Sequence, residues 1–177
     1  MLVLALAASI AAGPALAQFS YTTIDYDDCE TLETYEDGGV ALRCEGYGGF
    51  DVYPSDGDAR MEVDYGVRNE DFETFSAFNS AGETVEWFED IDGVQAATLR
   101  FFIDVDDRKA QALVVSKVGV PDTPGCVVGV VDAALEQANG VARGIASVAK
   151  YFDCDRDAVV IVPGASELVL GFNGADD

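Results

Sequence analysis

Apolar and polar residues alternate along much of the first half of the chain, which is the pattern of β-strands with one buried face. The alternation runs through 40–44, resumes at Phe50 and Val52, and continues through 60–65. A glycine-rich turn at 46–49 separates the first two of these stretches. We therefore predict an antiparallel meander in this region.

A second pair of strands is indicated further along the chain. Residues 97–105 alternate between apolar and polar, residues 110–118 are more uniformly apolar, and the polar segment 106–109 lies between them. This order predicts a hairpin. In 71–79, phenylalanine recurs at every third position, which favours either a short helix or a loop held by its aromatic side chains.

The pattern changes from strand to helix after residue 131. Residues 126–131 read as a buried strand, and Asp132 is placed to N-cap a helix that begins near Ala133. From there to Phe152 apolar residues recur at three- and four-residue steps, so one helix face should pack on the sheet. Gly140 and Gly144 each weaken a helix, which predicts that the helix backbone approaches the sheet closely at these positions.

The chain closes with two apolar runs, 158–163 and 167–172, around Pro163 and Gly164, and these predict a last hairpin. Together the elements predict an α+β fold, a mainly antiparallel sheet with one C-terminal helix packed on a face. We assign 18–172 to this single domain and 173–177 to a polar tail.

The N-terminus has the features of a signal peptide. Residues 1–12 are apolar or small, a Gly-Pro pair follows, and Ala15 and Ala17 occupy the positions that a signal peptidase reads. Cleavage is expected between Ala17 and Gln18, which makes 1–17 the signal and the mature protein periplasmic or secreted. No Lys or Arg precedes Arg43, so an upstream start codon is an alternative. The absence of a cysteine just after Ala17 disfavours a lipoprotein.

The four cysteines indicate two disulfides, because their number is even and the chain is predicted to be exported. Three connectivities are open. We favour Cys29–Cys44 with Cys126–Cys154, because each pair encloses one local supersecondary unit. We therefore expect the fold to be held together by two disulfides. A structural zinc site is disfavoured, because the four cysteines lack the paired spacing that such sites use.

The net charge of −23 bears on partners. It repels phosphate backbones and anionic headgroups, which argues against nucleic acid and acidic membranes as partners. A basic envelope protein or cations would be attracted. The alternative is that the charge serves solubility in a saline exterior.

Histidine is absent from the sequence, which excludes Ser-His-Asp and Cys-His catalysis and imidazole zinc sites. No phosphate-binding glycine motif occurs, and nothing points to a cofactor. Carboxylates are the remaining chemistry. The turns at 89–92 and 104–107 are candidates for an irregular calcium site. Glu86, beside Trp87, is the candidate acid for a glycan hydrolase.

Several short motifs resemble those of small secreted proteins of Gram-negative bacteria whose activity is unknown. The motifs are the cysteine and Gly-Tyr-Gly turn at 44–49, Phe78-Asn79, the acidic-Trp pair at 86–87, Leu99-Arg100-Phe101, Ala142-Arg143, and the cysteine-bounded strand and helix from 126 to 154. The resemblance implies export and disulfides and implies no activity.

The sequence favours an exported, non-catalytic binding protein, with Tyr47, Glu86 and Trp87 as candidate binding residues. No catalytic residue, metal ligand or cofactor site is assigned. The alternatives are a carboxylate-dependent hydrolase of envelope glycans and a calcium-stabilised envelope protein.

Overall fold

The computed structural model describes residues 17–36, 38–69 and 71–173. Of the predicted signal peptide, residues 1–16 lie outside the described residues, as do residues 174–177 of the predicted tail. The strands, in chain order, are β1 (Gln18–Thr23), β2 (Glu30–Thr34), β3 (Val40–Tyr47), β4 (Phe50–Gly57), β5 (Arg60–Tyr65), β6 (Asn79–Ala81), β7 (Thr84–Asp90), β8 (Gly93–Val105), β9 (Arg108–Lys117), β10 (Val127–Asp132) and β11 (Val160–Ile161).

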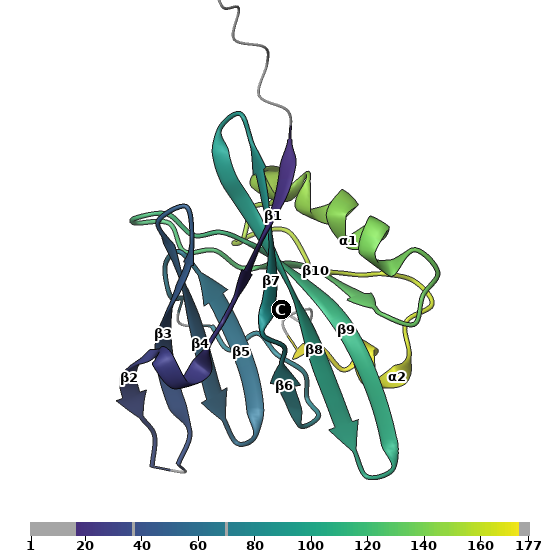
Figure 1. The fold of residues 1–177 in the computed structure, drawn as a ribbon. Coiled ribbons are helices and arrows are strands. Elements are labelled where there is room, and N and C mark those ends of the chain that lie inside the picture. Colours follow the sequence, from purple (N-terminus) through teal and green to yellow (C-terminus); the bar gives the residue numbers. More distant parts are fainter. Residues whose placement is uncertain (1–16, 37, 70, 174–177) are drawn as a thin grey trace, which may run out of the picture.

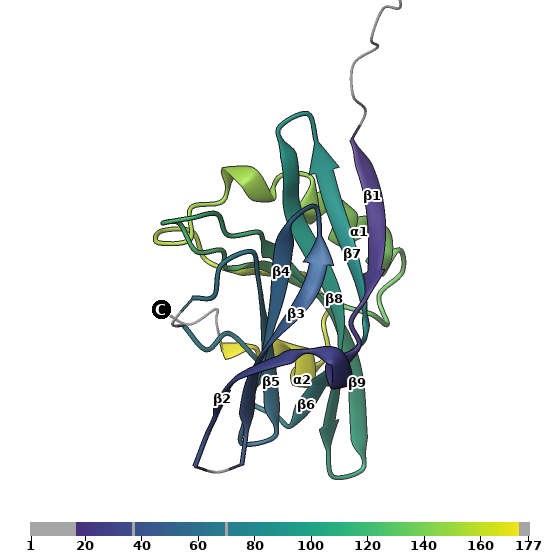
Figure 2. The same ribbon diagram turned by 60° about the vertical axis from the view of Figure 1, so that its left-hand side comes forward.

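The strands form two sheets (Figures 1 and 2). The larger has seven strands in the order β1-β7-β8-β9-β10-β11, with β6 also paired to β8, and the smaller has the order β2-β3-β4-β5. Every pairing between these strands is antiparallel except that of β10 with β11. The predicted meander is β3-β4-β5 and the predicted hairpin is β8-β9, so the mainly antiparallel sheet is confirmed.

Two hydrophobic clusters hold these layers together. One lies between the two sheets and contains Val52, Tyr65, Trp87 and Leu99. The other lies between the larger sheet and helix α1 (Ala138–Ala146). The larger sheet is therefore buried on both sides over part of its area. On its outer face, the one that carries α1, the helix covers only part of the strands.

Both predicted disulfides are present. Cys29 and Cys44 are joined, with Cα atoms 4.5 Å apart, and tie the segment before β2 to β3. Cys126 and Cys154 are joined, with Cα atoms 5.8 Å apart, and tie the start of β10 to the chain beyond α1. The favoured connectivity is confirmed.

The predicted helix start is wrong. Asp132 is the last residue of β10, and α1 begins six residues later at Ala138. The Asp132 carboxylate accepts from the backbone N–H of Ala134 and that of Ser166, at 2.9 and 2.8 Å, so it caps a turn and fastens the C-terminal segment. After α1 only a short 3-10 helix, η2 (Ala149–Tyr151), continues the predicted pattern. Besides η2, one other 3-10 helix, η1 (Tyr26–Asp28), lies between β1 and β2.

The predicted role of the helix glycines is also wrong. A Cβ at Gly140 or Gly144 would meet nothing within 4 Å, so neither glycine approaches the sheet. The buried face of α1 consists of Ala138, Ala142 and Ala146 instead. Their small side chains let the helix lie close to the sheet.

The expected last hairpin does not form. β11 pairs with β10 in parallel, and the second apolar run forms a short helix, α2 (Glu167–Leu170). The C-terminal region therefore contains two α-helices, α1 and α2, whereas the sequence predicted a single helix there. The segment 71–79 contains no helix, which favours the loop alternative, and its Phe75 is fully buried against Phe172 with ring centroids 5.2 Å apart. Among the described residues, no helix is long and apolar enough to cross a membrane.

Candidate functional site

Trp87 lies in the core between the two sheets, with no exposed surface. Its indole Nε1 donates to Thr22 Oγ1 at 2.8 Å, and its ring centroid is 5.5 Å from that of Tyr65. A Cβ at Gly46 would lie 2.2 Å from the Phe50 backbone oxygen and 3.1 Å from the Trp87 ring, so the close approach of β4 requires glycine there and Trp87 fills the remaining space. Trp87 is positioned to stabilise the fold and has no surface for a ligand.

Tyr47 is half-buried beside Trp87, with ring centroids 6.1 Å apart. Its hydroxyl accepts from Ser20 Oγ at 3.0 Å and donates to Glu89 Oε1 at 3.3 Å. Its hydrogen-bonding groups are thus used within the protein, between β3, β1 and β7.

Glu86 points to the opposite side of β7 from Trp87, because neighbouring side chains of a strand alternate between its faces. There Arg143 of α1 holds it, with Nε 3.1 Å from each carboxylate oxygen and Nη2 2.6 Å from Oε2. Tyr21 of β1 also donates its hydroxyl to Glu86, and Arg143 Nη2 donates to that hydroxyl at 2.5 Å. The Arg143 guanidinium lies over the Phe19 ring, 4.7 Å from its centroid. Glu86 therefore anchors α1 to the edge of the sheet.

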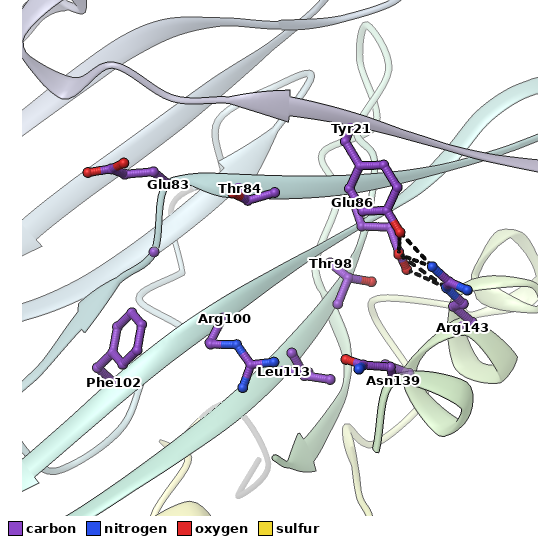
Figure 3. A pocket seen from close by; sticks show the side chains of 12 residues that line it. Tyr21, Glu83, Thr84, Glu86, Thr98, Arg100, Phe102, Leu113, Asn139 and Arg143 are labelled. Atoms are coloured by element: carbon purple, nitrogen blue, oxygen red, sulfur yellow. Dashed lines mark hydrogen bonds and ion pairs between the residues drawn. The ribbon is translucent and has the colours of Figure 1, made fainter. Parts of the chain in front are cut away.

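A groove of about 480 Å³ lies beside this anchor, on the part of the outer face that α1 leaves open (Figure 3). Tyr21 and Arg143 lie at one end of the groove. Thr98, Arg100 and Phe102, all from strand β8, line its floor. The remaining lining is mixed, with apolar groups beside hydroxyl, amide and carboxylate groups: Gly82, Glu83, Thr84, Glu86, Leu113, Asn139 and Ala142.

Arg100 is the unusual member of this lining. Its Nη1 donates to Gln111 Oε1 at 3.0 Å, and no carboxylate of the described residues lies within ion-pair distance of it. Lys117, which donates to the carbonyl oxygen of Phe152, is the other cation of the described residues without such a partner. The remaining cations all form ion pairs: Arg43, Arg60, Arg68, Arg108, Lys109, Arg143, Lys150 and Arg156.

A second hollow, of about 540 Å³, continues the groove along the sheet. Arg100 and Phe102 line both hollows, and Gln111, Asp132 and Ser166 line the second. Two aromatic side chains of the first hollow are solvent-exposed, Tyr21 at 57% and Phe102 at 41%. The groove thus combines exposed aromatic rings, neutral hydrogen-bonding groups, the carboxylates of Glu83, Asp104 and Asp132, and the Arg100 guanidinium.

In the turns considered for calcium, the carboxylates form ion pairs with lysine side chains. Lys150 Nζ lies 2.6 Å from an oxygen of Asp90 and 2.9 Å from one of Asp92, and Lys109 Nζ lies 2.7 Å from Asp104. No group of three or more metal-ligating side chains that could hold a metal occurs in the described ranges.

Three carboxyl groups lie away from the groove, between β5 and the larger sheet: Glu62 is buried, and Asp64 and Glu73 are half-buried. Burial, and after it the charge of Asp64, raise the pKa of Glu62 to about 8. Burial likewise raises the pKa of Asp64 to about 6 and that of Glu73 to about 7. Glu62 accepts from the backbone N–H of Glu73, and Glu73 accepts from that of Val127, at 3.1 and 2.9 Å. These groups link β5 to the following loop and to β10.

Of the sequence-predicted residues, Tyr47 and Trp87 come together in the core, while Glu86 joins the rim of the groove. Sequence reasoning missed Tyr21, Arg100 and Phe102. The alternation in 97–105 does assign Arg100 to the face opposite Leu99, but no local pattern shows whether a carboxylate reaches it.

No protein-family model, curated protein or solved structure matches the chain. The resemblance to secreted proteins of Gram-negative bacteria therefore stays a prediction.

Proposed function

We propose that this chain is an extracytoplasmic, non-catalytic binding protein, and that its groove across β8 holds a ligand that carries a carboxylate. The observation that carries the proposal is Arg100, whose guanidinium lines the groove, donates to the neutral Gln111 and forms no ion pair with a carboxylate of the described residues. Arginine binds a carboxylate through two parallel hydrogen bonds, a stronger contact than a neutral one. The chain has 33 acidic and 10 basic residues, so a basic side chain is expected to find an acidic partner. An arginine in a groove that forms no ion pair among the described residues is therefore unusual.

The contacts of Glu86 favour binding over catalysis. A general acid must be able to give a proton to the substrate. Glu86 instead accepts hydrogen bonds from Arg143 on both carboxylate oxygens and from Tyr21, so its oxygens are occupied within the protein. The hydrolase alternative therefore loses its candidate acid.

The overall charge limits the ligand. A net charge of −23 repels polyanions at long range, so a ligand with one or few negative charges suits the groove better. A basic partner protein, which the same charge favours, would bind to the acidic exterior and would not need Arg100. The two disulfides support an extracytoplasmic location, where disulfides persist.

The test uses the oxidised, isotope-labelled protein and a panel of small carboxylic acids paired with their primary amides. We expect some acids to shift the NMR signals of Arg100, Thr98 and Phe102, and their amides to bind at least tenfold more weakly. Arg100→Gln should abolish the preference for the acid. The matched control is Arg156→Gln, because the Arg156 side chain is 83% exposed and lines neither hollow of the groove. Acids that bind only elsewhere, or that bind Arg100→Gln equally well, would contradict the proposal.

A further inference from the structure

We infer that the ligand of the β8 groove is an oligosaccharide bearing a single carboxylate, an inference that rests on the function proposed above. The shape of the groove is the first argument. Its two hollows, about 480 and 540 Å³, meet at Arg100 and Phe102. From Thr98 to Phe102 a strand extends about 13 Å, which accommodates more than one ring of a linear ligand. A chain of linked rings fits two joined hollows better than one compact molecule does.

The aromatic side chains are the second argument. The apolar C–H face of a sugar ring packs on an aromatic ring, and Tyr21 and Phe102 expose their rings on the two sides of Arg100. The Tyr21 ring is held in place before a ligand arrives, and Phe102 has a backbone neighbour on one side. The Tyr21 hydroxyl is bonded to Glu86 and Arg143, and Phe102 lies against Gly82, where an added Cβ would be 3.5 Å from its Cε2. Preorganised rings lose little entropy on binding.

The polar groups are the third argument. Besides Glu83 in the first hollow and Asp104, Lys109 and Asp132 in the second, the lining offers neutral polar groups: Thr84, Thr98 and Asn139 in the first hollow, and Gln111 and Ser166 in the second. These neutral groups both donate and accept hydrogen bonds, as the hydroxyl groups of a sugar do. A fatty acid would instead need a continuous apolar wall.

Arg100 supplies the final element of specificity. Because it lies where the hollows meet, its guanidinium would bind a carboxylate on a sugar in the middle of the ligand. A densely charged polyuronate would be repelled by the protein's own charge. The ligand class is therefore a mainly neutral glycan with an isolated uronic acid.

The experiment compares acidic oligosaccharides with neutral partners of the same length: cellobiouronic acid with cellobiose, and xylotriose carrying one glucuronic acid with xylotriose. Binding is followed by the NMR signals of the groove and by calorimetry. We expect at least one acidic member to bind at least tenfold more tightly than its partner. Arg100→Gln should remove that difference, while Phe102→Ala should weaken both members at least fivefold.

The controls separate the two proposals. Phe102 is 41% exposed, so its alanine variant should still fold with both disulfides formed but melt at a lower temperature, and binding is compared well below that temperature. Arg156→Gln should bind like the unmodified protein. If carboxylic acid fragments occupy the groove but no acidic saccharide is preferred over its neutral partner, the saccharide inference is wrong and the binding function stands. If neither fragments nor saccharides occupy the groove, both are wrong.

Discussion

Glu86 and Trp87 are adjacent in the sequence but lie on opposite faces of the seven-stranded sheet. Trp87 is buried between the two sheets, whereas Glu86 binds Arg143 of α1 on the outer face. An acidic-aromatic pair at consecutive positions of a strand cannot line one site, because strand side chains alternate with a period of two. Residues that share the groove with Glu86 come from the alternate position Thr84 of the same strand and from β1, β8, β9 and α1.

Breaking the ion pair between Arg143 and Glu86 should moderately lower the free energy of unfolding. Arg143→Gln should lower the free energy of unfolding by about 1 kcal/mol, because the pair is bidentate but the Arg143 side chain is 43% exposed and partly screened by solvent. This corresponds to a fall of about 2–4 °C in melting temperature for a domain of this size. The difference from the unmodified protein should shrink in 1 M salt.

The control for this prediction is Arg156→Gln, which removes a pair whose arginine is 83% exposed. Its effect should stay within about 0.5 kcal/mol. Equal melting temperatures for Arg143→Gln and the unmodified protein would show that Glu86 does not anchor α1.

The exposed glycines of α1 predict a gain in stability. Gly144→Ala should stabilise the protein by about 0.5–1 kcal/mol, since alanine restricts the unfolded chain and its Cβ meets nothing within 4 Å. Thermal unfolding would measure the shift. Gly129→Ala is the contrast, because its Cβ would lie 3.1 Å from Ile145 Cδ1, and it should destabilise. A destabilised Gly144→Ala variant would restore the close-approach interpretation.

The strands of this fold could be predicted from the sequence, but the start of α1 could not. Strands with one buried face were predictable, because alternation directly reports burial on one side of a sheet. The helix was mislocated because 133–137 has the same apolar spacing as α1 but forms turns, with Gln137 in a left-handed conformation. The Asp132 carboxylate bonds Ser166, a contact over 34 residues that no local pattern reveals.

The disulfides predict unequal losses of stability. The chain-entropy model gives about 3 kcal/mol for a loop of 15 residues and about 3.6 kcal/mol for one of 28, the separations of Cys29–Cys44 and Cys126–Cys154. Replacing Cys126 and Cys154 by Ser should therefore lower the urea midpoint somewhat more than replacing Cys29 and Cys44. Alkylation before and after reduction should detect no thiols and then four. Thiols that react without reduction would contradict both bridges.

The groove was less predictable than the disulfides. Cysteine number and context constrain pairing strongly, whereas Arg100 gains its significance from what surrounds it in space. Its neighbours Tyr21, Thr84 and Asn139 come from three separate elements or their ends. A chain with many carboxylates gives no reason from sequence to expect one arginine to lack an acidic partner.

The buried carboxyl groups predict that the protein is more stable at pH 5 than at pH 8. The folded-state pKa of Glu62 is raised to about 8 by burial, so between about pH 4.5 and 8 the folded state keeps a proton that the unfolded state has lost. Stability is therefore highest below the unfolded pKa and falls as the pH rises through the folded pKa. Glu73 and Asp64, raised to about 7 and 6, act in the same direction, although Arg68 opposes the shift at Glu62 and Asp64.

Glu62→Gln isolates this effect from the general charge repulsion of the protein. Glu62 is only 8% exposed, and glutamine matches its shape without ionising. The variant should gain roughly 1–3 kcal/mol at pH 8 and change little at pH 5, so its melting temperature should depend less on pH. Glu136→Gln, at an exposed carboxylate, should keep the pH dependence of the unmodified protein. If Glu62→Gln and Glu136→Gln show the same dependence, Glu62 is ionised in the folded protein and its link to Glu73 is an ordinary charge-assisted hydrogen bond.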